Sequence, residues 1–384
     1  MNLLDHYAEQ LAQLRTQGNL RQFTALQPLG REIQIGEKRM LNFASNDYMG
    51  LAADLSLREQ FFDQTPMRDR VMSSSSSRLL TGNFPAYEQL EQCLRHAFGR
   101  AALLLNSGYH MNIGILPALS DSRTLILADK LVHASMIDGI RLSTAKYLRY
   151  RHNDLVHLQQ LLTQYHDAAD YDRIIVVTES IFSMDGDETD LAQLVQLKQQ
   201  FSKVMLYVDE AHAIGVRGAQ GLGCAEQYQV MHEIDFLVGT FGKALASVGG
   251  YLICDPIIRE YLINRMRPLI FSTAQPPICM AWTQFVFEKS LALKPQRQYL
   301  QHISQQLQQA VRDKGYACPS SSHIVPIVVG ASDQAVQLAQ QLQQAGLYIM
   351  PVRPPTVPQN SSRLRICMNT HITTADLDLL MQHL

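Results

Sequence analysis

Short apolar runs alternate with amphipathic segments through the middle of the chain. Six runs have the length and β-branched content of strands, and they end at Asn106, Asp129, Glu179, Glu210, Thr240 and Cys254. Segments with helical spacing lie between them, and one of these has a capping aspartate, Asp190, three residues before Gln193. Strands and helices in alternation predict an α/β fold with a largely parallel sheet.

The pattern changes after about residue 280. A glutamine-rich helical stretch is followed by a few strand-like runs, and a last helix is predicted to begin near Thr373. The chain is therefore expected to have three parts. These are an N-terminal helical segment over 1–45, a large domain over 46–280 and a smaller α+β domain over 281–384.

Composition narrows the class of protein. Of the 384 residues, 46% are hydrophobic and 18% are charged, so a sizeable core is expected. The net charge of −2 argues against a nucleic-acid-binding protein, which usually has a basic face. No apolar run approaches the roughly 18 residues of a membrane span, and the first residues lack a signal-peptide core. We expect a cytoplasmic protein with neither nucleic acid nor membrane as a partner.

The cysteines give no sign of a metal or redox centre. No two of the six are spaced as Cys-x-x-Cys. We expect unpaired thiols in a reducing compartment and no metal site.

The stretch "VDEAHAIG", residues 208–215, admits two interpretations. One is the DEAH box of nucleic-acid helicases, which needs a Gly-x-x-x-x-Gly-Lys-Ser/Thr phosphate loop as its partner. The only Gly-Lys pair is Gly242-Lys243, where Leu237 replaces the first glycine and Ala244 the hydroxyl residue. The sequence therefore argues against a helicase.

The other interpretation joins Asp209 to Lys243. Both residues follow the ends of predicted parallel strands, and ligands bind at that edge of such sheets. A lysine among small residues, in "TFGKALASVGG", can bond to the aldehyde of pyridoxal 5'-phosphate, and a carboxylate can pair with the pyridine nitrogen. An ordinary ion pair between the two remains the alternative.

A phosphate cradle is also predicted. In "LNSGYHMNIG" a strand ends at Asn106, Ser107-Gly108 turns, and a helix begins. Backbone N–H groups at a helix start attract phosphate. Thr240, three residues before Lys243, can add a hydroxyl.

Several motifs together resemble a known family. "NFASNDYMGL", "ADKLVHASMIDG", "TESIFSMDGD", "VDEAHAIGVRGAQGLG" and "TFGKALASVGG" occur in the order found in the α-oxoamine synthases, from about residue 20 to the C-terminus. These are fold-type I, aspartate-aminotransferase-like enzymes that use pyridoxal 5'-phosphate. The resemblance implies a large domain with a mainly parallel sheet and a smaller α+β C-terminal domain.

The resemblance also implies roles around the cofactor. Lys243 would bond to the aldehyde and move the substrate proton, and Asp209 would pair with the ring nitrogen. His212 would touch the ring hydroxyl, and His133, otherwise a core residue, would stack on the ring. Further cofactor contacts are implied for Gly108, Tyr109 and Thr240 at the phosphate, for Ser183, and for Ser272 and Thr273 at the phosphate of a neighbouring subunit.

Substrate contacts are implied in the C-terminal part. Arg365, otherwise an exposed strand residue, would bind the amino-acid carboxylate, a task that suits a bidentate guanidinium. Arg21 and Thr356 would border the acyl-chain site. The stretch "VRPPTVPQNSSRLRI", residues 352–366, resembles the family members that use alanine and a seven-carbon acyl donor.

The implied enzyme is a homodimer that condenses L-alanine with pimeloyl-CoA or pimeloyl-acyl carrier protein. A glycine-using synthase of the same family and a catalytically inert subunit with this fold remain alternatives. The run Ser73–Ser77 is either a flexible linker or a tight polar loop. Its residues Ser73–Ser76 depart from the family, which usually has glycines there.

Overall fold

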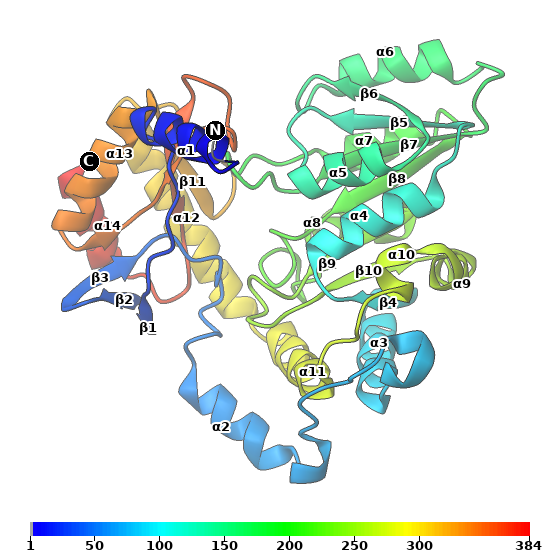
Figure 1. Cartoon of the computed structure of the whole chain (residues 1–384), viewed down its shortest axis with the longest axis horizontal. Helices are drawn as coiled ribbons and strands as arrows, with labels where there is room; N and C mark the ends of the chain where they lie inside the picture. The colour runs from blue at the N-terminus through cyan, green and yellow to red at the C-terminus, as the bar shows by residue number, and fades with distance from the viewer. Residues whose placement is uncertain (1–2) are drawn as a thin grey trace. The chain divides into compact units, whose positions relative to one another are not determined.

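Residues 3–384 are described by a computed structural model, in which the chain divides into two compact units (Figure 1). The larger unit comprises Asp54–Ser183 and Glu188–Arg297. The smaller unit comprises the described part of Met1–Ala53 together with Met184–Asp187 and Gln298–Leu384.

The segment expected over residues 1–45 is grouped with the C-terminal part of the chain, and its residues 1 and 2 lie outside the described part. Strand pairing accounts for this grouping. β3 (Lys38–Asn42) pairs in parallel with β12 (Leu347–Tyr348). A pairing between segments so far apart in sequence leaves no mark on the local pattern.

The larger unit is built on a seven-stranded sheet with the order β4-β10-β9-β8-β7-β5-β6. β10 is antiparallel to both of its neighbours, and the other pairs are parallel, which confirms the predicted mainly parallel sheet. The strands are β4 (Ala101–Leu105), β5 (Thr124–Asp129), β6 (Lys146–Tyr150), β7 (Arg173–Glu179), β8 (Val204–Asp209), β9 (Phe236–Thr240) and β10 (Gly250–Cys254).

The sheet is buried on both faces except at one edge. Every residue of β4, β5, β9 and β10 is buried, as expected for strands covered on both sides. β6 is one of the two edge strands, and only its last residue, Tyr150, is buried. Its polar sequence explains why the apolar pattern did not predict it.

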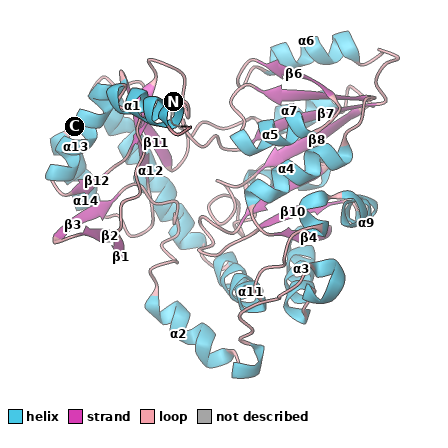
Figure 2. Cartoon of the chain, viewed as in Figure 1, coloured by secondary structure: helices cyan, strands magenta, loops and turns pink. Residues whose placement is uncertain are grey.

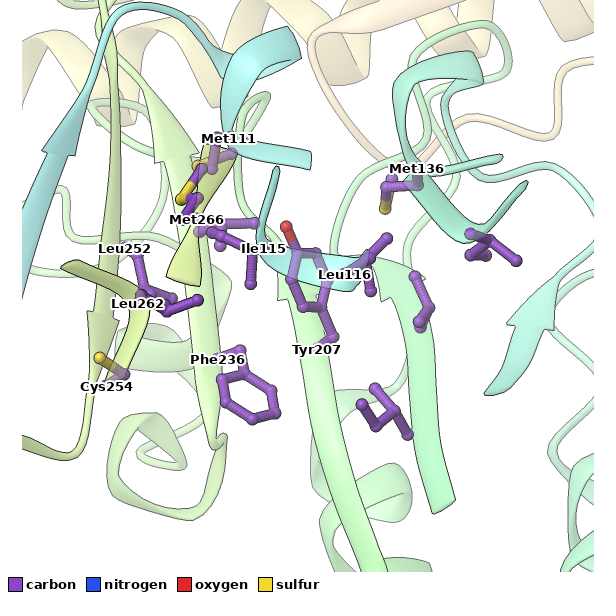
Figure 3. Packing of buried hydrophobic residues seen from close by; sticks show 14 of the residues in the cluster. Met111, Ile115, Leu116, Met136, Tyr207, Phe236, Leu252, Cys254, Leu262 and Met266 are labelled. Carbon is purple, nitrogen blue, oxygen red and sulfur yellow. The ribbon is translucent and has the colours of Figure 1, made fainter. Parts of the chain in front are cut away.

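Helices lie against the sheet (Figure 2), and helices and strands both contribute side chains to the core. Methionines and leucines of α4 and α5 pack on Tyr207, Phe236 and Leu252 of the strands (Figure 3). The helices of this unit are α2 (Leu55–Gln64), α3 (Pro85–Phe98), α4 (Gly108–Leu119), α5 (Ala134–Leu142), α6 (Leu155–Tyr165), α7 (Leu191–Lys198), α8 (Cys224–Gln227), α9 (Pro256–Arg265), α10 (Arg267–Ile270) and α11 (Pro277–Leu291).

The smaller unit contains two small sheets, with the orders β1-β2-β3-β12 and β11-β14-β13. The last helix has Thr373 as its N-cap, close to the predicted start, and Thr373 forms a capping box with Asp376. Helix α12 (Lys294–Asp313) begins in the larger unit and belongs to the smaller unit from Gln298 on. The other elements of the smaller unit are α1 (Asp5–Thr16), β1 (Gln27–Leu29), β2 (Glu32–Ile35), β11 (Ile324–Gly330), α13 (Ser332–Gln344), β13 (Pro351–Val352), β14 (Ser362–Cys367) and α14 (Thr374–His383).

No helix within residues 3–384 is both long enough and apolar enough to cross a lipid bilayer.

Candidate active site

Polar side chains gather where the parallel strands of the larger unit end. Glu179 of β7 is paired in register with Asp209 of β8, and Asp209 with Val238 of β9. The carboxyl ends of parallel strands lie at one edge of a sheet, and ligands bind there in this class of fold. The loops that leave these strands carry His133, Ser183, His212 and Lys243.

A tight loop holds Lys243 just beyond β9. The Phe241 N–H donates to the carbonyl of Gly249, and the Ala246 N–H donates to the carbonyl of Lys243 itself. Ala246 has a φ of 45°, in the left-handed region. The loop places the Lys243 Nζ 2.9 Å from Nε2 of His212, which lies on the turn after β8. Two of the predicted residues are therefore in direct contact.

Asp209 is buried, and donors surround its carboxylate. Oδ1 accepts the Ala211 N–H at 2.9 Å, and Oδ2 accepts the Asn112 amide at 3.1 Å. The side chain is 6% exposed, so a cationic ligand group beside it would interact with little screening by water.

His133 begins α5 as its N-cap. Its Nδ1 accepts the Ser135 N–H at 3.2 Å and lies 2.7 Å from the Ser135 hydroxyl. The backbone N–H of His133 donates to Oε1 of Glu179 at 2.6 Å. The helix start and the end of β7 thus fix the position of the imidazole.

Burial controls the protonation of two groups in this cluster. It lowers the pKa of the His133 imidazole; Asp209 raises that pKa and Lys243 lowers it further. Burial raises the pKa of the Glu179 carboxyl well above its ordinary value, and the Asp209 charge raises it more. Both groups therefore favour their neutral forms.

Glu210 anchors the loop that carries His212. It accepts the Ser180 hydroxyl at 2.6 Å and the N–H groups of Cys224 and Ala225 at 3.0 and 2.7 Å, so it caps the start of α8. Burial raises the pKa of Glu210 to about 7, against the lowering effect of these donors. These contacts hold the loop in place.

The start of α4 has the features of an anion site. Ser107 caps it by accepting the His110 N–H at 3.1 Å, and the first turn contains no acidic residue. A Cβ added to Gly108 would lie 3.6 Å from Cβ of Thr240, so β9 and the helix start lie side by side. The Thr240 hydroxyl donates to the carbonyl of Gly249. Helix N–H groups and a nearby hydroxyl suit a phosphate.

Tyr109 is half exposed, and its hydroxyl donates to Asp138 Oδ2 at 2.7 Å. Ser183 lies in the loop after β7, partly buried. Both are near the strand ends in the chain, and their predicted cofactor contacts stay predictions.

The segment with Ser272 and Thr273 is tied to the α4 start of its own chain. Asn106 Nδ2 donates to the Thr273 carbonyl at 2.8 Å. The Ser74 hydroxyl donates to the carbonyl of Gln275 at 2.6 Å, so the serine run is a tight loop and not a flexible linker. A contact of Ser272 and Thr273 with a neighbouring subunit stays a prediction.

The predicted substrate residues lie in the smaller unit. Arg365 on β14 donates to Oδ1 of Asn46 at 3.0 Å and to the Tyr48 hydroxyl at 3.3 Å. Burial alone would lower the pKa of Arg365, but Cys367 and Tyr48 outweigh it and the pKa is raised. The guanidinium therefore stays charged.

Arg21 and Thr356 contact each other. The Arg21 Nη2 donates to Oγ1 of Thr356 at 3.2 Å, and both side chains are exposed. The two residues predicted for one substrate region are thus neighbours in the smaller unit. Their contact with an acyl chain stays a prediction.

Sequence reasoning missed three residues of the cluster: Glu179, Asn112 and Ser135. Glu179 had a usable signal, because it closes a predicted strand at the same edge as Asp209. Asn112 also had one, as a polar residue in the apolar stretch "MNIGILPAL". Ser135 had none beyond its place two residues after His133.

The donor set fits pyridoxal 5'-phosphate. Lys243 can bond to an aldehyde, the buried Asp209 carboxylate can pair with a pyridinium nitrogen, and the α4 start can hold a phosphate. His133, held neutral, presents an aromatic ring.

Comparison with known proteins gives the class. The family model described as aminotransferase class I and II matches residues 38–384. The chain therefore belongs to the class I and II aminotransferase family.

More similar proteins narrow the group. The 8-amino-7-oxononanoate synthase of Haemophilus ducreyi is 54% identical over 384 aligned residues, which cover 98% of each chain. A solved 8-amino-7-oxononanoate synthase from Francisella tularensis superposes with a TM-score of 0.74 at 26% identity, covering 90% of this chain and 95% of that one. Serine palmitoyltransferase from S. paucimobilis, solved with bound PLP and myriocin, gives a TM-score of 0.89 at 26% identity, covering 100% and 97%. Within its family the chain groups with the 8-amino-7-oxononanoate synthases.

Proposed function

We propose that this protein condenses L-alanine with a pimeloyl thioester to give 8-amino-7-oxononanoate, carbon dioxide and the free thiol, a step of biotin biosynthesis. One observation carries the proposal at the site: the Lys243 amine lies 2.9 Å from His212, on the loop that follows the buried Asp209. The 54% identity with a synthase of that name over 98% of the chain supports the choice of reaction.

The cofactor of the enzyme is pyridoxal 5'-phosphate, which, when bound, supplies an electron sink for negative charge at the amino-acid α-carbon. Gly108 and Thr240 would hold its phosphate, with Tyr109 and Ser183 nearby. Asp209 would hold a proton on the ring nitrogen, and its burial strengthens that charge–charge contact.

Lys243 has two tasks in the proposal. Its Nζ would hold the cofactor through the aldehyde, and as a free amine the same Nζ would remove the alanine α-proton. His212, in contact with this amine, orients it and would also reach the ring hydroxyl. His133 supplies a neutral ring for stacking, because burial lowers the pKa of its imidazole.

The proposed reaction forms one carbon–carbon bond and breaks one carbon–sulfur bond and one carbon–carbon bond. The α-carbon of alanine forms a bond to the acyl carbon, the acyl carbon–sulfur bond breaks, and the sulfur takes a proton from water and leaves as a thiol. The bond from the α-carbon to the alanine carboxylate then breaks and releases carbon dioxide, and a proton from Lys243 replaces it. Arg365 would bind that carboxylate before it leaves, and Arg21 and Thr356 would border the acyl chain.

We further propose that the enzyme is a cytoplasmic homodimer in which Ser272 and Thr273 reach the phosphate site of the partner chain. Two observations support this. Phe271, next to Ser272, is 71% exposed, which suits a residue that a second copy covers. All six cysteines are free thiols, which suits a reducing compartment.

Genetic complementation tests the proposal. A bacterial strain that needs biotin because it lacks this synthase should grow without biotin when it expresses the protein. The same strain expressing Lys243→Ala at equal protein level should not grow. Growth of neither strain, with soluble protein present, would reject the proposed reaction.

A further inference from the structure

Asn112 lies buried between two residues of the candidate site, Asp209 and His133, yet the proposed function gives it no task. It is on α4, one turn after Gly108, and is 2% exposed. The other buried residues of α4, which is described in full, are apolar or glycine. A buried amide in such a face needs hydrogen-bond partners.

Asn112 uses its whole amide group. Nδ2 donates to Asp209 Oδ2 at 3.1 Å and to the Ser135 hydroxyl oxygen at 2.9 Å, and Oδ1 accepts the Tyr207 hydroxyl at 2.5 Å. A carboxylate only accepts hydrogen bonds, so the NH2 end must face Asp209. Tyr207, whose ring lies beside Ile115 in the core, holds the amide in that orientation (Figure 3).

The Ser135 hydroxyl links Asn112 to His133. Its oxygen accepts from Asn112, so its own hydrogen is free to point toward His133 Nδ1 at 2.7 Å. The Ser135 backbone N–H also donates to Nδ1, at 3.2 Å. With two donors aimed at it, Nδ1 has no proton, and the neutral ring has its proton on Nε2.

We propose that Asn112 is a positioning residue that joins Asp209 to His133 through Ser135 and thereby sets the tautomer of His133. The inference rests on the proposed function, because it takes its importance from the roles given there to these two residues. The Asn112 amide thus donates to the Asp209 carboxylate and at the same time favours the Nε2–H form of His133. Burial of His133, which lowers the pKa of its imidazole, agrees with a neutral ring.

A purely structural role for Asn112 is the competing explanation. α4 and α5 pack closely here: a Cβ added to Gly139 would lie 2.3 Å from the Asn112 carbonyl oxygen. Packing explains a buried residue at this position, but it predicts no effect of the side-chain amide on the protonation of His133. The two explanations therefore differ in the state of one nitrogen atom.

The tautomer is measurable by NMR on the full-length holoenzyme labelled with ¹⁵N-histidine. The spectrum correlates ring nitrogens with carbon-bound ring protons, and the signal missing in His133→Gln identifies His133. In the wild type we expect an unprotonated Nδ1 and a protonated Nε2.

The sharpest variant is Asn112→Asp, which exchanges the NH2 group for an oxygen of similar size and leaves an acceptor for Tyr207. The Ser135 hydroxyl then donates to the introduced carboxyl group, and its oxygen accepts from His133. The Ser135 backbone N–H still donates to Nδ1, so we expect the Nδ1-protonated tautomer to become populated beside the Nε2–H form and the Nδ1 shift to move away from the wild-type value. A wild-type Nδ1 shift in a folded Asn112→Asp protein overturns the proposal.

A second variant keeps the test decisive if Asn112→Asp does not fold. Asn112→Leu frees the Ser135 hydroxyl to rotate, so both tautomers become populated and the Nδ1 shift moves away from the wild-type value. A wild-type shift in this variant also overturns the proposal. Tyr251→Phe, which removes another buried hydroxyl from the same sheet, is the control and should leave the shift unchanged.

The NMR result does not depend on turnover. An assay of the wild type with alanine and a pimeloyl thioester, run in parallel, tests the proposed function. An active wild type with an unmoved tautomer in the variants rejects only the inference about Asn112. An inactive wild type with a moved tautomer rejects only the proposed function.

Discussion

Glu179 and Asp209 occupy paired positions at the ends of two adjacent parallel strands, and both carboxyl groups are buried. Two charged carboxylates so close together repel each other, and one of them is expected to keep its proton. Burial, followed by the Asp209 charge, raises the pKa of Glu179 well above its ordinary value. Asp209 accepts hydrogen bonds from the Asn112 amide and the Ala211 N–H.

The first prediction concerns Glu179. Because its carboxyl is neutral and accepts the His133 N–H through Oε1, glutamine can take over that contact and alanine cannot. We expect Glu179→Ala to weaken pyridoxal 5'-phosphate binding by about tenfold, in line with the loss of a buried hydrogen bond, and Glu179→Gln to weaken it much less. Fluorescence titration of the apoenzyme with the cofactor measures both. Equal losses in the two variants would show that the charge of Glu179, and not its hydrogen bond, matters.

The second prediction identifies the lysine that bonds to the cofactor. Borohydride reduction followed by dialysis should leave cofactor attached to the wild type and to Lys289→Ala, a change at an exposed lysine of α11 in the same unit. Lys243→Ala should lose all cofactor under the same treatment. Mass spectrometry of the intact chains reads the result. Retained cofactor mass on Lys243→Ala would rule out Lys243 as the attachment point.

The third prediction concerns stability and pH. Burial raises the pKa of Glu210 from an ordinary value of 4.5 to about 7. A group with a raised pKa binds its proton more tightly in the folded state, so its contribution to stability is complete below pH 4.5 and is lost as the pH rises to 7. The loss amounts to about 3 kcal/mol across that window.

Glu210→Gln removes the titration, although it replaces one acceptor oxygen by an NH2 group that faces Cys224 or Ala225. We expect the variant to be less stable than the wild type at pH 5 and to close much of that gap at pH 8. Urea unfolding at both pH values measures the difference. A gap that stays constant with pH would contradict the raised pKa.

Much of the larger unit could be predicted because most strands of its sheet are almost entirely buried. Such strands leave continuous apolar runs, and β5, β7 and β9 begin and end where those runs do. β6 could not be predicted, because an edge strand has no need of an apolar sequence. The β3–β12 pairing could not be predicted either, because the local sequence pattern does not show which distant segments pair.

The candidate site was predictable to the extent that its residues end strands. Asp209, His212 and Lys243 follow strand ends and are brought together as the sheet rule requires. Asn112 and Ser135 sit inside or at the start of helices, and only the packing of α4 on α5 brings them between Asp209 and His133. The spacing of residues along the sequence does not show which side chains helix packing brings together.

The fourth prediction concerns the substrate carboxylate. Arg365→Lys keeps the charge but loses the fork that binds a carboxylate through two parallel hydrogen bonds. We expect the KM for alanine to rise by about 10- to 100-fold and the KM for the thioester to change little. Arg363→Lys is the matched control, two residues away on β14 with its guanidinium paired to Asp185. A similar rise in both KM values for Arg365→Lys would place the residue outside the amino-acid site.

The most direct test of the proposed function is the identity of the product. The purified enzyme is incubated with pimeloyl-CoA or pimeloyl-acyl carrier protein and with L-alanine whose carboxyl carbon is ¹³C-labelled, and mass spectrometry follows the product and the released gas. The account predicts 8-amino-7-oxononanoate without the label, labelled carbon dioxide in equal amount, and neither with Lys243→Ala. A product formed from glycine and not from alanine, or no product with either thioester, would contradict it.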